Sequence, residues 1–173
     1  MRMKIYFYHT EDVQYIYGRW RRGAFPGHFL YGATHLADHG IEMVMHRHRD
    51  YPSRWRTALY TAWRILTCPE RIDAVYATHY KGIELIIFLR ALGLFRPKIV
   101  IWHHQPVIKS DKLWRDRLGR LFYKGIDRMF FFSQKLYDDS LKTGKVAPCQ
   151  MRVGHWGADL DFYDRMMEAN PVE

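Results

Sequence analysis

The sequence predicts an α/β fold: a Rossmann-like, doubly wound parallel sheet of about six strands with helices on both faces. Along all 173 residues, short β-branched or aromatic runs alternate with segments of helical spacing. The composition, 48% hydrophobic and 16% aromatic, is that of a globular chain with its own core. Since crossovers are right-handed, the commonest strand order, 3-2-1-4-5-6, is expected.

Six short runs have the length and residue types of buried strands. They cover residues 3–8, 41–46, 73–78, 98–102, 128–132 and 150–153. The run at 98–102 follows a proline and is apolar after its first residue. This apolar run predicts a central position in the sheet.

The first helix is expected at residues 28–39, after a long loop that follows the first strand. Gly40 stands where a C-terminal cap belongs. The apolar residues of this segment share one helical face, which carries Phe29, Leu30, Ala33, Leu36 and Ala37.

The next two helices follow the second and third strands. Ser53 is the expected N-cap of the first of them. Its apolar side carries Trp55, Leu59, Ala62, Trp63 and Leu66. Residues 82–93 predict the second helix, which is expected to be largely buried because most of its residues are apolar.

Two further helices follow the fourth and fifth strands. Ser110 is the expected cap of a helix that Gly125 ends. Its inward residues are expected to be Leu113, Trp114, Leu118, Leu121 and Phe122. Ser133 then caps a helix over residues 134–143.

Charge and cysteine content limit the class of protein. Lys and Arg number 27 and Asp and Glu 18, so the formal net charge is +9. Cys68 and Cys149 lie far apart behind no secretory signal, which predicts a reducing, cytoplasmic setting without a disulfide scaffold. The most apolar stretch, 83–95, contains Glu84 and Arg90 and is too short to cross a bilayer. We expect a cytoplasmic protein, with peripheral contact at the inner face of a membrane as an extension of that setting.

Two stretches are expected to meet at the crevice above the first and fourth strands, where the predicted order reverses direction. One is the loop 19–27, in which Gly23 and Gly27 permit close backbone approach and could hold a phosphate. The other follows the fourth strand. His103 and His104 should point to opposite faces there, so only one of them is expected to face the crevice.

Each of these features has a second interpretation. The loop can be a flexible solvated segment, and a histidine at a strand end can be satisfied by nearby backbone. The sequence has no G-x-G-x-x-G turn, no G-x-x-x-x-G-K-[ST] loop, no spaced set of zinc ligands and no G-x-S-x-G elbow. Arginines beside His46 and His48 disfavour a cation there. No metal and no cofactor is expected.

Basic and aromatic residues are concentrated in the first third of the chain. The predicted acceptor-binding or membrane surface consists of Arg19, Trp20, Arg21, Arg22, Arg54, Trp55 and Arg56. Arginine attracts anionic headgroups and tryptophan prefers the membrane interface, so this stretch could rest on an anionic membrane surface. The alternative is that the tryptophans belong to the core and the arginines to a solvated face. No nucleic-acid motif accompanies the charge, and no nucleic-acid partner is expected.

Four segments resemble the N-terminal half of a GT-B fold glycosyltransferase, most of all glycosyltransferase family 4. GHFLYGATHLADHGIEMV at 27–44 is similar to the family's glycine loop, first helix and second strand. DAVYATH at 73–79 and PKIVIWH at 97–103 resemble its third strand and the strand that ends in a histidine near the donor sugar. VGHWGADLDFY at 153–163 is similar to the I-P-N-G-V-D-x-x-x-F segment that closes the domain, with His155 and Trp156 in place of Pro-Asn.

This resemblance implies that residues 1–173 form a single Rossmann-like N-terminal, acceptor-binding domain, with the C-terminal donor-binding domain absent from the sequence. Joined to that domain, the chain would be a retaining hexosyltransferase that uses a nucleotide-sugar donor to build a cell-surface polysaccharide or glycolipid. It is not expected to turn over alone. The resemblance assigns the donor-sugar contact, as catalytic residue, to His103 and the approach to the donor phosphates to Gly23, Gly27 and His104.

Two other classes stay open at this point. A stand-alone module could bind a glycan, a nucleotide or an anionic membrane without chemistry. A nucleotide-dependent oxidoreductase or epimerase would need a tight glycine turn and an acidic residue at the end of the second strand, where His46 stands instead.

Overall fold

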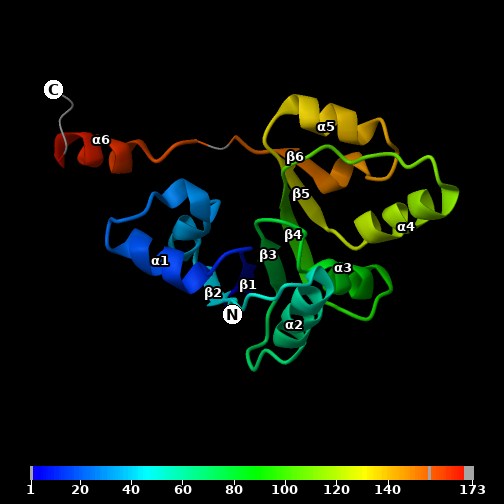
Figure 1. Cartoon of the computed structure of the whole chain (residues 1–173), viewed down its shortest axis with the longest axis horizontal. Helices are drawn as coiled ribbons and strands as arrows, with labels where there is room; N and C mark the ends of the chain where they lie inside the picture. Colours follow the sequence, from blue (N-terminus) through cyan, green and yellow to red (C-terminus); the bar gives the residue numbers. More distant parts are fainter. Residues whose placement is uncertain (1, 156, 170–173) are drawn as a thin grey trace.

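The computed structural model describes residues 2–155 and 157–169, so Trp156 and the outermost residues of the predicted 1–173 domain lie outside the described residues. Its centre is a six-stranded, all-parallel sheet, which confirms the predicted α/β, Rossmann-like class (Figure 1). The strands are β1 (Lys4–Tyr8), β2 (Glu42–Met45), β3 (Ala74–Ala77), β4 (Lys98–His103), β5 (Arg128–Phe131) and β6 (Met151–Val153).

Helices fill the connections between the strands, and a last helix follows β6 at the end of an extended segment (Figure 1). The α-helices are α1 (Val13–Arg21), α2 (Arg54–Leu66), α3 (Glu84–Ala91), α4 (Leu113–Lys124), α5 (Gln134–Leu141) and α6 (Leu160–Ala169). Short 3-10 turns occur at η1 (Gly27–Leu30), η2 (Ala33–His35), η3 (Ala37–His39) and η4 (Pro148–Gln150).

The predicted strand order is wrong in its first half. The observed order is β2-β1-β3-β4-β5-β6, so β2 is the edge strand and β1 lies between β2 and β3. Burial explains the exchange. The second strand begins with the exposed Glu42 and is only half-buried beyond it, which suits an edge. The third strand has three of its four residues buried, which suits an interior position. The predicted central position of β4 is confirmed.

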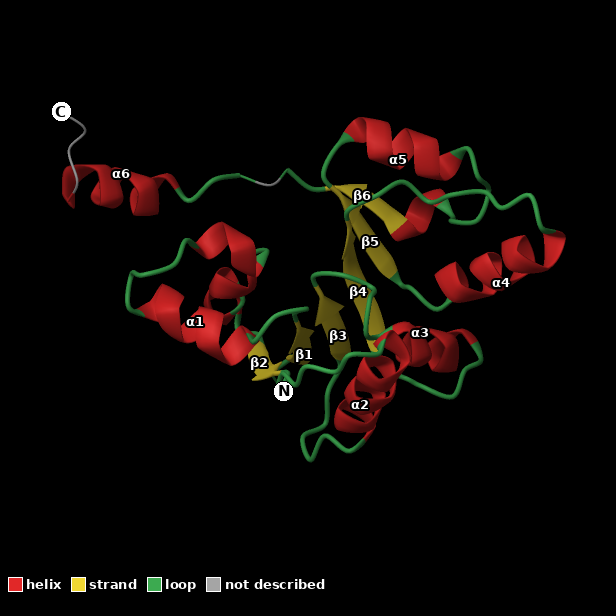
Figure 2. Ribbon diagram, in the orientation of Figure 1, coloured by secondary structure: helices red, strands yellow, loops and turns green. Residues whose placement is uncertain are grey.

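The two faces of the sheet are covered unequally (Figure 2). On one face, Tyr6, Val75 and Ile101 belong to a core that extends to α2, α3 and α5. On the other face, Phe7 packs with Val13 of α1 and with the 3-10 turns. Right-handed crossovers account for this division, because the chain moves in one direction from β1 to β2 and in the opposite direction at every later step.

The expected helix over 28–39 is wrong, and part of the expected loop before it is helical. Helix α1 lies earlier, and the Asp12 carboxylate caps it by accepting from the amides of Gln14 and Tyr15. Residues 27–39 form three 3-10 turns instead. Tyr31 and Gly32 have φ of 52° and 78°, and two consecutive left-handed residues cannot belong to one right-handed helix.

The predicted buried side of α2 is wrong, and that of α4 is right only in part, because Phe122 packs against the core. In α2 the fully buried residues are Thr61, Ala62 and Ile65, and of the predicted apolar side only Ala62 is among them. In α4 the buried residue is Asp116, whose carboxylate pairs with Lys145 at 3.0 Å. The larger apolar residues of both helices lie at the surface instead: Trp55, Leu59, Trp63, Leu66, Leu113, Trp114 and Leu118.

Candidate functional site

The reversal of chain direction lies between β1 and β3, one strand away from the predicted place, because β2 and β3 flank β1 on opposite sides. In open α/β sheets, ligands bind outside the carboxyl ends of the strands at this point. A pocket of ≈ 440 Å³ lies there, and we call it the switch-point pocket. Its lining residues are all polar or aromatic and include one carboxylate: His9, Thr10, Glu11, Phe25, Phe29, Tyr31, Thr78, His79 and His104.

Three histidines of the switch-point pocket are oriented by the backbone. Nδ1 of His9 accepts from the Glu11 amide at 3.0 Å, and Nδ1 of His79 accepts from the Lys81 amide at 2.9 Å. Nε2 of His104 donates to the Thr78 carbonyl at 2.8 Å. Each ring therefore has a defined tautomer when it is neutral.

The pKa values of two of these histidines favour the neutral ring. Burial lowers the pKa of His9. Burial, helped by the neighbouring His104 and Lys81, lowers the pKa of His79 to about 4. At neutral pH the pocket therefore offers uncharged imidazole groups, which can hydrogen-bond to sugar hydroxyls or phosphate oxygens.

The ring of His104 is packed among aromatic side chains. It stacks on His79 with centroids 5.2 Å apart, and the edges of Tyr31 and Phe132 approach it with centroids at 5.7 and 4.9 Å. These neighbours come from the segments after β3 and β5 and from the 3-10 turns, so a substrate group at His104 would meet a ring whose orientation is fixed.

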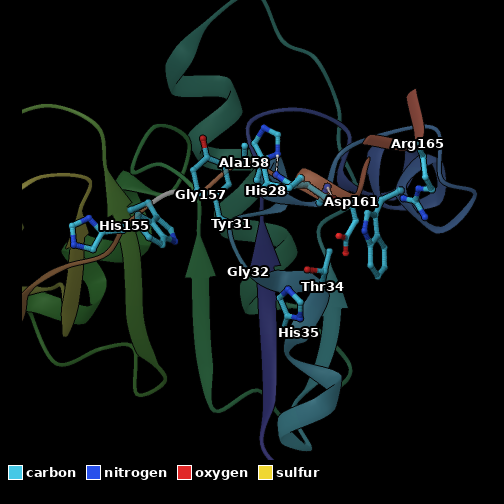
Figure 3. Close-up of a pocket in the computed structure, with 15 residues that line it drawn as sticks. His28, Tyr31, Gly32, Thr34, His35, His155, Gly157, Ala158, Asp161 and Arg165 are labelled. Carbon is cyan, nitrogen blue, oxygen red and sulfur yellow. Dashed lines mark hydrogen bonds between the residues drawn. The ribbon is translucent and has the colours of Figure 1, made fainter. Parts of the chain in front are cut away.

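A second, larger cleft adjoins the first through Tyr31, which lines both. This turn cleft has ≈ 670 Å³ and lies between the 3-10 turns and the segment after β6 (Figure 3). Its main lining residues are Trp20, Gly27, His28, Tyr31, Trp102 and Asp159. Aromatic faces and polar groups share the lining, as is typical of sites for sugars and other ring-shaped polar ligands.

Asp159 ties the segment after β6 to residues 27–32, which we call the glycine turn. Its Oδ2 accepts from the Gly27 amide at 2.7 Å, and its Oδ1 accepts from the Phe162 amide at 3.1 Å. Its own amide donates to Nδ1 of His28 at 3.1 Å. The hydrogen bond from the Gly27 amide is the main cause of the lowered pKa of Asp159. A carboxylate thus stands at the amide to which a phosphate was expected to bind.

A relay of hydrogen bonds holds the left-handed Tyr31. The Trp102 indole donates to the Tyr76 hydroxyl at 2.6 Å, and this hydroxyl donates to the Tyr31 carbonyl. Burial raises the pKa of Tyr76 to about 12, so its hydroxyl stays protonated and able to donate. The central strands therefore fix the turn that separates the two cavities.

The predicted site residues fall in different places. Gly27 lines the turn cleft, and a Cβ added there would lie 3.0 Å from Nε1 of Trp20. Gly23 has φ +70° and its amide donates to the Trp20 carbonyl, so it ends α1. His104 lines the switch-point pocket, whereas His103 does not. The two predicted stretches meet at the switch-point pocket, which Phe25 and His104 both line.

His103 lines a third cavity of ≈ 520 Å³ on the opposite face of the sheet, which we call the helix-side pocket. The prediction that the two histidines point to opposite faces is confirmed. Only 3% of His103 is exposed. Its Nδ1 donates to the Gln105 carbonyl at 2.5 Å, its Nε2 accepts from the Tyr123 hydroxyl at 3.4 Å, and its ring stacks on Tyr80. Burial lowers its pKa.

The predicted arginine and tryptophan surface is divided between two helices that cover opposite faces of the sheet. Arg19, Trp20, Arg21 and Arg22 belong to α1 and its cap. Trp20 lines the turn cleft, and Arg19 donates to the Ala24 carbonyl at 2.9 Å. The other members belong to α2, where Arg54 pairs with Glu84 at 2.7 Å and the exposed Trp55 lies under Arg56.

Sequence reasoning did not single out four residues of the site: His9, Tyr31, His79 and Asp159. The sequence does indicate two of them, because His9 and His79 are each the first residue after a predicted strand. Once β1 and β3 are neighbours, this position brings both histidines to one pocket. Tyr31 depends on a positive φ at a non-glycine residue, which no local pattern indicates.

Comparison with known proteins adds no family to this picture: no protein-family model matches the chain, and no curated protein sequence does. Among residues 2–155 and 157–169, no helix has the length and apolar character needed to cross a bilayer. The same residues contain no group of three or more His, Cys, Asp or Glu side chains placed to hold a metal ion.

A buried histidine outside the site should make stability depend on pH. His46, which follows β2, is 2% exposed, is hydrogen-bonded to Tyr6 at 2.9 Å, and has its pKa lowered by burial to about 4. In the unfolded chain this histidine takes up a proton near pH 6.5. Its contribution to stability is therefore fully present above that pH and is lost as the pH falls toward 4. We expect the free energy of unfolding to drop by about 2 kcal/mol from this group between pH 7.5 and 5.

Urea unfolding at the two pH values measures this drop, and His46→Phe is the variant that removes the titrating ring. The pH-dependent part of the loss should shrink by the contribution of His46, whatever the variant's stability at pH 7.5. An unchanged pH dependence in the variant would contradict the assignment to His46.

Proposed function

We propose that this chain is the N-terminal, acceptor-binding half of a retaining GT-B sugar transferase similar to glycosyltransferase family 4. Its reaction would move a sugar from a nucleotide-sugar donor to a glycan or a lipid-linked acceptor. The observation that carries the proposal is the meeting of the glycine turn with the end of β4 at the carboxyl edge of the sheet. Tyr31 and His104 bring the two segments together, with ring centroids 5.7 Å apart.

The donor would lie over the switch-point pocket. There Nδ1 of a neutral His104 would accept from a sugar hydroxyl, while N–H groups of the neutral His9 and His79 would donate to oxygens of the sugar and the departing diphosphate. Catalysis of this kind depends on positioning and on stabilising the charge that develops on the leaving group. This assignment transfers the sugar contact from His103 to His104, because His104 shares a pocket with Tyr31 of the glycine turn.

The Gly27 amide has a specific part in the proposal. Asp159 occupies it with a carboxylate oxygen at 2.7 Å. A donor phosphate that binds the same amide must displace this carboxylate, because an N–H group has one proton to donate. Donor binding would therefore loosen the contact between Asp159 and the turn, and with it the start of α6.

The acceptor would occupy the turn cleft beyond the Gly27 amide, which the donor phosphate would reach from the adjoining switch-point pocket. The faces of Trp102 and Tyr31 could pack on sugar rings, and Asp161 and His35, which also line the cleft, could bind hydroxyl groups. A cleft of ≈ 670 Å³ is of the size that holds a small oligosaccharide or the head of a glycolipid.

The test is a transfer assay with the protein encoded by the complete reading frame that contains these residues. We expect release of nucleoside diphosphate that requires both a nucleotide-sugar and an acceptor lipid or glycan, with a product heavier by one sugar in mass spectrometry. Nucleotide-sugar binding without transfer, from a frame that encodes no second α/β domain, would favour a stand-alone binding module instead.

A further inference from the structure

Each of the three exposed tryptophans in the described part of the chain carries an arginine over its ring. Trp55, Trp63 and Trp114 are 61%, 56% and 61% exposed. The guanidinium carbons of Arg56, Arg64 and Arg115 lie 5.6, 5.6 and 5.2 Å from the respective ring centroids. An aromatic ring with a cation on its face suits a boundary between an apolar and an anionic environment.

These tryptophans belong to two apolar rows on one side of the molecule. Residues at intervals of four and three form a row along α2, and a second row lies on α4. Helix α3 packs against both helices, on the side of the sheet away from α1 (Figure 2). We call this surface the α2–α4 face, and its members are Trp55, Leu59, Trp63, Leu66, Leu113, Trp114 and Leu118.

The helix-side pocket lies between the two helices that carry the rows. Its lining includes Arg54 of α2, Phe88 of α3, and Trp114, Leu118 and Phe122 of α4. The α4 row therefore opens onto this pocket, while α2 contributes Arg54, the residue next to the first tryptophan of its row. The α2–α4 face flanks a pocket whose lining has both apolar and charged side chains.

Two carboxylates beside this face are paired with basic groups. Glu84 accepts from Arg54 at 2.7 Å. Asp116 is neutralised by Lys145 at 3.0 Å and Arg120 at 3.2 Å. The arginines above the tryptophan rings add to a chain of net charge +9. An anionic surface with an apolar interior complements both the rows and their charged rims.

We propose that the α2–α4 face docks on a lipid bilayer that contains anionic headgroups. Its tryptophan and leucine side chains would enter the interfacial layer, while the arginines meet lipid phosphates. The docking element is α2 with α4, and not α1 with Arg21 and Arg22. The helix-side pocket would then open toward the lipid, and, if the proposed sugar transfer holds, it could receive the chain of a lipid-linked acceptor.

Flotation with vesicles tests the proposal. The probes are vesicles of phosphatidylcholine alone and of phosphatidylcholine with about one third phosphatidylglycerol, at low salt and at about 0.5 M salt. We expect the chain to float with the anionic vesicles at low salt only. Two pairs of variants with matched changes locate the surface, and unfolding midpoints establish that each variant is folded.

In the first pair, R56Q/R115Q should reduce the vesicle partition coefficient by about tenfold or more, since each arginine near an anionic surface contributes roughly fivefold. Its control, R21Q/R22Q, removes the same charge from α1 and should leave the coefficient within about twofold. In the second pair, W55S/W114S should also lose about tenfold or more, while Y15S/L160S, at exposed positions elsewhere, should not.

Three results would overturn the inference. The first is equal flotation of R56Q/R115Q and wild type, and the second is a larger loss in R21Q/R22Q, which would move the docking surface to α1. The third is a concentration-dependent dimer, seen by light scattering, that W55S/W114S abolishes, because the face would then be covered by a second copy of the chain. None of these results depends on transfer activity, so the proposed function can fail while this inference holds.

Discussion

Replacement of His104 by alanine in the complete protein should lower the rate of sugar transfer by about 100-fold. The imidazole is the group that the structure places beside the glycine turn, with its ring 5.7 Å from Tyr31 and its Nε2 bonded to the Thr78 carbonyl. Removal of this half-buried ring takes away the proposed donor-sugar contact together with one hydrogen bond and three ring contacts. The free energy of unfolding should therefore fall by about 1 to 2 kcal/mol, which leaves the protein folded in the assay.

Two histidine variants serve as comparisons in the same assay. His39→Ala, at an exposed position in η3, should transfer sugar like wild type. His103→Ala should destabilise the fold by about 2 kcal/mol, because the ring is 3% exposed and both of its nitrogens are hydrogen-bonded. If His104→Ala transfers at the wild-type rate, the assignment of the donor contact to His104 is wrong.

Gly125→Ala should be the most damaging single substitution for the fold. A Cβ at Gly125 would lie 2.0 Å from the carbonyl oxygen of Ile87 and 3.1 Å from the amide nitrogen of Ala91. Both atoms belong to the backbone of α3, so the clash is relieved only if α4 and α3 move apart. We expect a loss of more than about 3 kcal/mol in the free energy of unfolding.

Gly93→Ala is the matched control for this prediction. Gly93 has φ +76° but open space where a Cβ would be added, so the variant adds backbone strain without a clash. Its expected loss is about 1 kcal/mol. Urea unfolding of both variants compares the cost of the steric clash with the cost of backbone strain. A smaller loss of unfolding free energy in Gly125→Ala than in Gly93→Ala would refute the close approach of α3 and α4.

The strands were predictable because each is a short run with a strong β preference and clear boundaries. All six exist within a few residues of the predicted ranges. Their order was not predictable, since it depends on which strand tolerates the edge, and this is decided by packing on both faces. The half-buried second strand and the buried third strand show the difference only after folding.

The helices show where periodicity misleads. The capping signal of Asp12 and the spacing of Val13, Ile16, Tyr17 and Trp20 indicate α1, but the glycine-bearing segment after it has an equally regular pattern. In α2 and α4 the larger apolar residues are at the surface, and small or paired polar ones are buried. Hydrophobicity alone identifies an amphipathic helix, but it cannot tell a core-facing side from one that meets another partner.

The candidate site was predictable in its location at the carboxyl edge, and less so in its members. Strand alternation correctly separated His103 from His104, but which of them shares the cavity with the glycine turn depends on which face the turn covers. His9 and His79 enter the same pocket only because β3 is next to β1. The contact between Asp159 and Gly27 joins residues 132 positions apart and is a product of tertiary structure.

Chemical-shift mapping of the isotopically labelled chain with uridine and guanosine diphosphates and their sugar conjugates tests the central claim most directly. We expect weak binding, roughly millimolar, because under the proposed function the isolated chain supplies only one half of a GT-B cleft. The shifts should centre on the Gly27 amide, Tyr31 and the His104 ring, with Asp159 perturbed as its carboxylate is displaced. Shifts confined to the helix-side pocket around His103, or no shifts with any of these ligands, would contradict it.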